Sequence, residues 1–179
     1  LCHNGHITLT PFVIEYYNKV CNANTTINDH ISDSYLIANI INEKIKNILS
    51  KESTLTSKHI GCIITEICYT INEGAYSIIL IVKDFGLIAF KDNYGIRPLS
   101  YGTKQNKLLF ASESVALYSQ NYKNVAEILS TEILIYNLKK KKKKIEKIEK
   151  YIKFGCNMTP CIFEWIYLAR AESKIQQTF

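Results

Sequence analysis

The fold is decided by residues 75–91, AYSIILIVKDFGLIAFK, and by two helical repeats that precede them. Residues 75–83 are rich in isoleucine and valine, residues 84–86 (Asp-Phe-Gly) offer a turn, and residues 87–91 resume an apolar run. Apolar runs of this composition on both sides of a short turn are typical of a β-hairpin. We therefore expect two antiparallel strands in this stretch.

Two amphipathic helices are predicted before the hairpin. Apolar residues recur at three- and four-residue steps in both segments, and this spacing places them on one helical face. Ser32 is a candidate cap for the first helix, and Glu73-Gly74 is a natural stop for the second. The apolar positions are Leu36, Ile37, Ile40, Ile41, Ile45 and Ile48 in the first, and Ile60, Ile63, Ile64, Ile67 and Ile71 in the second.

Short strands are predicted after the hairpin at residues 98–101, 107–111 and 133–138, with turns at 93–95 and 102–106. A short helix is expected to start at residues 112–114, with Ser112 or Ser114 as its cap, and residues 160–169 favour a closing helix because proline suits a first helical turn. Ile145, Ile148 and Ile152 fit either a helix face or a strand that returns across a hairpin. This succession of helices, antiparallel strands and a last helix predicts an α+β layered domain.

The basic excess of the chain is local. Of 22 basic residues, six form the run from Lys139 to Lys144, and without them the chain has 16 basic and 16 acidic residues. Nucleic-acid surfaces spread their basic groups over one face, so we expect no nucleic acid and no membrane as partner. The lysine run is interpreted as a solvated loop.

The chain is long enough for one globular domain, since 47% of its 179 residues are apolar. It has no apolar run of the length of a membrane span and no leader, which favours a cytoplasmic protein. Its six cysteines lack the spacing of a metal site, and Cys62 and Cys68 are predicted to be core residues. The chain begins with Leu1, and we expect it to be a piece of a longer protein.

The first candidate for chemistry is His3-Asn4-Gly5, which is followed by an expected break of the segment at Pro11. An asparagine amide beside a glycine N–H can present two donors to one developing oxyanion, which suits acyl transfer. Asn-Gly is also the commonest turn signal, and the residues alone favour the turn.

Asp33 is the second candidate, at the head of the first predicted helix. A carboxylate there can cap the helix or hold the ammonium group of a ligand, and the residues alone do not separate these roles. Arg97 and Glu113 could orient a partner group, although nothing in their spacing requires it.

Taken together and in order, several segments resemble the amidophosphoribosyltransferase family, and the resemblance runs nearly end to end. The segments "YGIRPL" (94–99), "ASESVAL" (111–117) and "PCIFE" (160–164) combined are specific to this family, whereas the others are shared with other class II glutamine amidotransferases. Those others are His3-Asn4-Gly5, Ser32-Asp33-Ser34, Gly74-Ala75-Tyr76 and residues 86–90.

The resemblance implies an N-terminal nucleophile hydrolase fold, a four-layer α-β-β-α sandwich, present here in incomplete form. Residues 1–179 would be part of the glutamine amidotransferase domain, with its first part and the phosphoribosyltransferase domain outside the chain. The complete enzyme would hydrolyse glutamine and transfer the ammonia to phosphoribosyl pyrophosphate, giving 5-phosphoribosylamine for purine biosynthesis. It would be a homo-oligomer, with no cofactor in this chain and Mg²⁺ in the phosphoribosyltransferase domain.

The resemblance also assigns site residues. Asn4 and Gly5 would form the oxyanion hole, and Asp33 would bind the α-amino group of glutamine. The family nucleophile is an amino-terminal cysteine whose own amine is the base. Cys2 directly precedes the His-Asn-Gly motif, where the family does not place the nucleophile, so we expect this chain alone to be inactive.

Two alternatives remain open at this point. The chain could belong to another class II amidotransferase, such as the glucosamine-phosphate or asparagine-forming type, which would share Asn4, Gly5 and Asp33; the "PCIFE" segment argues against both. It could also be a truncated remnant without catalysis.

Overall fold

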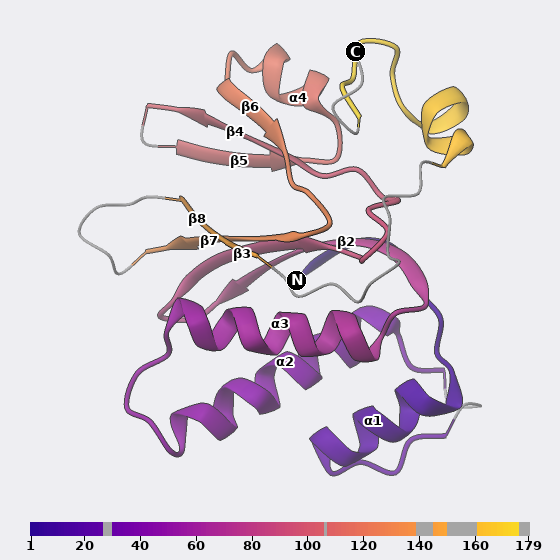
Figure 1. Cartoon of the computed structure of the whole chain (residues 1–179), viewed down its shortest axis with the longest axis vertical. Coiled ribbons are helices and arrows are strands. Elements are labelled where there is room, and N and C mark those ends of the chain that lie inside the picture. Colours follow the sequence, from indigo (N-terminus) through magenta and orange to yellow (C-terminus); the bar gives the residue numbers. More distant parts are fainter. Residues whose placement is uncertain (27–29, 106, 139–144, 150–160, 176–179) are drawn as a thin grey trace.

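The computed structural model describes residues 1–26, 30–105, 107–138, 145–149 and 161–175, and Figure 1 traces the chain. The elements form four layers in the order α-β-β-α (Figure 1). Three helices cover one face of a five-stranded sheet, a three-stranded sheet lies on its other face, and the short helix α4 (Ser114–Ser119) lies on the far side of the second sheet. The expected α+β sandwich is confirmed.

The five-stranded sheet is antiparallel at every pairing, in the order β1-β2-β3-β7-β8. Its strands are β1 (Cys2–Ile7), β2 (Gly74–Val82), β3 (Gly86–Lys91), β7 (Glu132–Asn137) and β8 (Ile145–Glu149). The second sheet has the order β5-β4-β6, with β4 (Ser100–Lys104), β5 (Lys107–Ala111) and β6 (Lys123–Glu127).

The main core lies between the first sheet and the helices α1 (Pro11–Cys21), α2 (Asp33–Leu49) and α3 (Ser57–Thr70). Burying an isoleucine or leucine side chain contributes about 1.5–3 kcal/mol, so the many buried aliphatic side chains of this layer stabilise it strongly. A smaller cluster fills the space between the sheets and comprises Ala89, Leu99, Ile128 and Leu134.

The central predictions are confirmed. The hairpin pairs β2 with β3 from Ser77↔Lys91 to Val82↔Gly86. The helical repeats form α2 and α3, whose periodic isoleucines are buried except for the partly buried Ile45 and Ile48, and β5 has the predicted bounds. The ambiguous segment after the lysine run is the strand β8, because Ile148 pairs with Ile133 of β7. The lysine run itself, and Ile152 and Pro160, lie outside the described residues.

Other predictions are wrong. Helix α1 was missed: Pro11 is its first residue, and the Thr10 hydroxyl accepts a hydrogen bond from the Val13 N–H. Proline needs no N–H partner at this position, so it starts this helix and does not break the chain.

Strand β6 was missed as well, and β4 extends to Lys104 through residues expected to turn. Helix α3 ends at Thr70, before Glu73-Gly74. Cys68 is buried as expected, but Cys62 is exposed because its side of α3 faces outward. The closing segment has a π-helical turn, η1 (Glu164–Leu168). Within the part of the chain that the structure describes, no helix has the length and hydropathy needed to cross a bilayer.

Candidate active site

Strand β1 forms one edge of the five-stranded sheet and carries Asn4 and Gly5. Gly5 lies opposite Tyr76 with φ of +131°, and a Cβ on it would lie 1.9 Å from the carbonyl oxygen of Ala75. No side chain fits at that distance. The close approach of β1 to β2 therefore requires glycine at this position, and the predicted Asn-Gly turn is wrong because both residues lie within a strand.

The N–H of Gly5 faces the open edge of the sheet. Antiparallel ladders alternate between residue pairs that exchange hydrogen bonds and pairs that do not. The N–H of Thr8 donates to the Glu73 carbonyl, whereas the N–H of Ile7 donates outward to Asp33. Gly5 is two residues from Ile7 and so has the same orientation, with its N–H directed away from β2.

Asn4 is exposed, and its carboxamide contacts a residue distant in sequence. The Nδ2 group donates to the Ser112 hydroxyl at 3.3 Å, across the junction between β5 and α4. A carboxamide NH₂ has two hydrogens, so this bond leaves the second hydrogen for another acceptor. One edge of the sheet thus combines a side-chain donor and the adjacent backbone donor.

Asp33 is the first residue of α2 and links this helix to β1. One carboxylate oxygen accepts the Ile7 N–H at 3.1 Å, and the other accepts the Ser34 N–H at 2.7 Å. Capping by the side chain of Ser32 is wrong, because Ser32 has the cap position but makes no side-chain hydrogen bond there. Asp33 satisfies a helix N–H instead, and its side chain stays 19% exposed.

Two histidines flank Asp33. His3 is 5% exposed, with its Nδ1 2.9 Å from the Ser34 hydroxyl and 3.5 Å from Asp33. Burial lowers the pKa of His3, and His6 adds to this, while the Asp33 carboxylate opposes it. His6 is 79% exposed, with its Nδ1 3.8 Å from the other Asp33 oxygen. The partly exposed Asp33 carboxylate therefore lies between a buried and an exposed imidazole ring.

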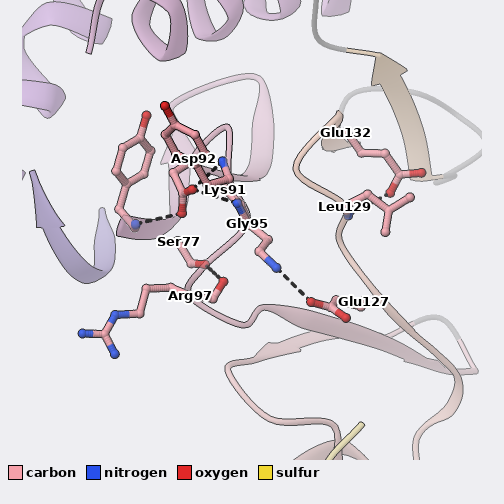
Figure 2. Close-up of polar contacts among 10 residues, drawn as sticks. Ser77, Lys91, Asp92, Gly95, Arg97, Glu127, Leu129 and Glu132 are labelled. Atoms are coloured by element: carbon pink, nitrogen blue, oxygen red, sulfur yellow. Dashed lines mark hydrogen bonds and ion pairs between the residues drawn. The ribbon is translucent and has the colours of Figure 1, made fainter. Parts of the chain in front are cut away.

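A polar network behind β1 fixes the strand that supports it. Asp92 accepts hydrogen bonds from the backbone N–H groups of Tyr76, Tyr94 and Gly95, so one carboxylate holds both β2 and the predicted turn at residues 93–95 (Figure 2). The Ser77 hydroxyl donates to the Arg97 carbonyl at 2.7 Å. Tyr76, the neighbour of Gly5 on β2, is thus held by Asp92 on the side away from β1.

Lys91 and Glu127 form a buried ion pair between the two sheets, with Nζ and Oε1 2.8 Å apart and 2% and 7% of the side chains exposed (Figure 2). Lys91 ends β3 and Glu127 ends β6, so the pair fixes the spacing of the sheets. This pair was not predicted from the sequence. The signal that could have indicated it is the charged residue at the end of each of the two strands.

Arg97 and Glu113 both pair within the chain. The Arg97 guanidinium forms an ion pair with Glu164 at 2.5 Å, and Glu113 accepts hydrogen bonds from the Arg170 N–H and the Ser173 hydroxyl. Both therefore orient the C-terminal segment. Cys2, the first residue of β1, is exposed and lies two residues from Asn4, hence on the same face of the sheet.

Metal ligation finds no support in this region. Among the described residues, no group of three or more His, Cys, Asp or Glu side chains is arranged to hold a metal ion. The candidate site thus consists of two hydrogen-bond donors, a carboxylate and flanking imidazoles.

Known proteins resemble this chain over nearly its whole length. The amidophosphoribosyltransferase of Haemophilus influenzae is 28% identical over 179 residues, covering 98% of this chain and 33% of that protein. The amidophosphoribosyltransferases of Escherichia coli and Saccharomyces cerevisiae are 27% and 26% identical, each with 34% of its length covered. The chain thus spans about a third of the length of these relatives.

Solved structures share the fold. The glutamine phosphoribosylpyrophosphate amidotransferase of B. subtilis, complexed with ADP and GMP, superimposes with a TM-score of 0.63 at 20% identity. The superposition covers 98% of this chain and 34% of the B. subtilis chain. A structure described as the allosteric regulatory enzyme of purine biosynthesis has a TM-score of 0.64 at 21% identity, with coverages of 98% and 33%.

The sequence profile described as "Glutamine amidotransferase domain" matches residues 18–119. That range is more than half of the 179 residues and includes the edge carboxylate Asp33, the hairpin and the Asp92 turn. The chain therefore belongs to the glutamine amidotransferase domain family.

Proposed function

We propose that this chain forms the glutamine-binding part of an amidophosphoribosyltransferase, with Asn4 and Gly5 as the oxyanion hole and Asp33 as the acceptor for the α-ammonium group. The observation that carries the proposal is that the three groups meet at one sheet edge. Asn4 and Gly5 lie on β1, and Asp33 of α2 is bonded to Ile7, which follows Gly5 by two residues. The names of the relatives support the same activity.

An extended glutamine is long enough to bridge these groups. Two residues along an antiparallel strand advance about 6.8 Å. Four single bonds of about 1.5 Å separate the α-nitrogen of glutamine from its amide carbon, an extended span of about 5 Å. With a hydrogen bond of about 2.9 Å at each end, an extended glutamine reaches from the Asp33 carboxylate to the Gly5 N–H.

The chemistry follows from this placement. A cysteine thiolate attacks the side-chain amide carbon of glutamine, and negative charge develops on the oxygen. The N–H of Gly5 and the second hydrogen of the Asn4 carboxamide stabilise this oxyanion, each by a factor of about 100–1,000 in rate. The C–N bond then breaks, ammonia leaves with an added proton, and water hydrolyses the thioester to glutamate.

We place the attacking cysteine outside these 179 residues, because Cys2 directly precedes the His-Asn-Gly motif. The chain alone is then expected to form no glutamate from glutamine. Production of glutamate that Cys2→Ser abolishes would contradict this placement and make Cys2 the nucleophile.

The activity of the whole protein extends the same proposal. Residues 1–179 would be part of the amidotransferase domain, and a phosphoribosyltransferase domain would pass the ammonia to phosphoribosyl pyrophosphate and bind Mg²⁺. The complete enzyme would work in the cytoplasm as a homo-oligomer in purine biosynthesis. The described residues of this chain contribute only to the glutamine step.

Calorimetric titration of the purified chain tests the glutamine proposal. L-Glutamine is expected to bind more tightly than D-glutamine or 4-carbamoylbutyrate, which lacks the α-amino group. Asp33→Asn keeps a hydrogen-bond acceptor for Ile7 but removes the charge. It should therefore weaken the binding of L-glutamine and leave the affinity for 4-carbamoylbutyrate unchanged. Asp84→Asn, in the exposed β2–β3 turn, is the matched control. Equal affinity for all three compounds would refute the role of Asp33, and absence of any binding would favour a remnant.

A further inference from the structure

The hydroxyl of Ser112 is the partner of the Asn4 carboxamide, although 108 residues separate the two in sequence. Ser112 lies just after β5 and before Glu113, the cap residue of α4. It was expected to be a helix cap, but α4 begins at Ser114 and Glu113 has the cap position. The Ser112 side chain is therefore available for a contact with the sheet edge.

An exposed asparagine side chain rotates among several rotamers unless a neighbour holds it. The bond to Ser112 uses one amide hydrogen and directs the other, and the acceptor is a hydroxyl, which can also rotate to suit. We propose that Ser112 is a positioning residue for the Asn4 carboxamide, and that its own place depends on the docking of the segment Glu164–Lys174, here called the C-terminal strap. This inference rests on the proposed function of Asn4.

Three contacts fasten the strap next to Ser112. Glu113 Oε2 accepts the Arg170 N–H at 2.9 Å and the Ser173 hydroxyl at 2.7 Å. The Ser114 hydroxyl accepts the Lys174 N–H at 2.8 Å. The two residues that follow Ser112 in sequence, Glu113 and Ser114, are therefore both bonded to the strap, while Ser112 itself is bonded to Asn4.

The other end of the strap is fastened as well. Glu164 is buried and paired with Arg97, whose carbonyl holds Ser77 of β2. Burial alone would raise the pKa of Glu113, but the Arg170 N–H, the Ser173 hydroxyl and the Arg170 charge together lower it. The carboxylate form thus favours the docked strap. Displacement of the strap would free the loop 112–114 and with it the orientation of the second Asn4 hydrogen.

Nuclear magnetic resonance of the chain labelled with ¹⁵N-asparagine tests the first step. The carboxamide pair of Asn4 is assigned by its loss in Asn4→Ala. In Ser112→Ala this pair should shift and its exchange with water should rise about two- to tenfold, the range for one lost hydrogen bond. Ser112→Thr keeps the hydroxyl and should restore both. Ser119→Ala removes a hydroxyl that bonds only within α4, so it is the control.

Glu113→Ala tests the second step, because it leaves Ser112 intact. In the uniformly ¹⁵N-labelled chain, backbone exchange at Arg170 should rise, and the Asn4 pair should shift as in Ser112→Ala. Glu113→Gln keeps an acceptor and should retain more of the native pattern. Unchanged backbone signals of β1 exclude a general loss of structure. The inference is overturned if the Asn4 carboxamide signals stay unchanged in Ser112→Ala. It is also overturned if they stay unchanged in Glu113→Ala although exchange at Arg170 rises.

The affinity for L-glutamine separates this inference from the function on which it rests. Positioning of an oxyanion donor acts on the transition state, so Ser112→Ala should change the affinity less than twofold. If the wild-type chain binds no glutamine but the Asn4 signals follow Ser112 and Glu113, the proposed function fails and the coupling stands. If glutamine binds and the signals do not respond, only the coupling fails.

Discussion

The carboxylate of Asp33 accepts a hydrogen bond from the backbone N–H of Ile7 at 3.1 Å, which joins the first turn of α2 to the outer edge of β1. The same carboxylate accepts the Ser34 N–H, so one side chain satisfies donors from two elements. Its structural role and its proposed role as a ligand for ammonium are compatible, because each carboxylate oxygen has two lone pairs.

Asp33→Ala is expected to destabilise the chain by about 1–3 kcal/mol, because it leaves the Ile7 and Ser34 N–H groups without this acceptor. Asp33→Asn keeps an oxygen acceptor and should cost less. Urea unfolding followed by circular dichroism measures both. Equal stability of wild type and Asp33→Ala would show that water replaces the carboxylate, and the link between α2 and β1 would then be unimportant for folding.

Gly5→Ala is expected to cost more than about 4 kcal/mol or to prevent folding, because the new Cβ would lie 1.9 Å from the Ala75 carbonyl oxygen and φ is +131°. Gly61→Ala in α3 is the comparison. There the added Cβ meets the Ile148 side chain at 3.0 Å, and the higher helix propensity of alanine opposes this contact. Gly61→Ala should stay within about 1 kcal/mol of wild type. Thermal unfolding of both variants provides the measurement, and similar transitions would contradict the prediction.

Lys91→Met is expected to destabilise by about 3–5 kcal/mol, because it leaves the Glu127 carboxylate buried without its cation. The double variant Lys91→Met/Glu127→Leu should recover most of this loss, since apolar pairs often replace buried ion pairs without cost. Lys46→Met breaks the exposed pair with Glu43 and should change stability by less than about 1 kcal/mol. A double-mutant cycle from urea midpoints gives the coupling, and additive losses would exclude a direct interaction.

The parts of the fold that could be predicted are those with strong local periodicity. The isoleucines of α2 and α3 repeat at helical spacing and most of them are buried, whereas the β2–β3 hairpin was predicted from its isoleucine and valine content and its turn. Pro11 was misread because a proline that starts a helix and one that ends a segment look alike in sequence, although Thr10 supplied the cap signal. Strand β6 begins with two exposed polar residues and its other three residues are partly buried, so its pairing with β4 is set by tertiary contacts.

The roles of the site residues stay a prediction, whereas the structure describes the surroundings of these residues. Asn4, Gly5 and Asp33 came from the resemblance, and the structure adds that Asn4 and Gly5 lie on β1 while Asp33 of α2 is bonded to the edge of that strand. Ser112 was named only as a helix cap, because its contact with Asn4 spans 108 residues and no local rule connects them. Long-range polar contacts of this kind follow from topology, which the periodicity of single segments does not determine.

The last prediction concerns pH and rests on His3, whose ring is buried against Ser34, Tyr76 and Asp33, with His6 nearby. Burial lowers its pKa below the ordinary value of 6.5. The unfolded chain then binds more protons than the folded chain once the pH falls below about 6.5, so stability decreases towards the folded pKa and is unaffected above this window.

His3→Gln keeps a hydrogen-bonding side chain but cannot titrate. Urea midpoints at several pH values between about 7.5 and 5 should fall more steeply for wild type than for His3→Gln. His6→Gln, which changes an exposed ring, is the matched control and should keep most of the slope. Parallel curves for wild type and His3→Gln would mean that Asp33 offsets the effect of burial.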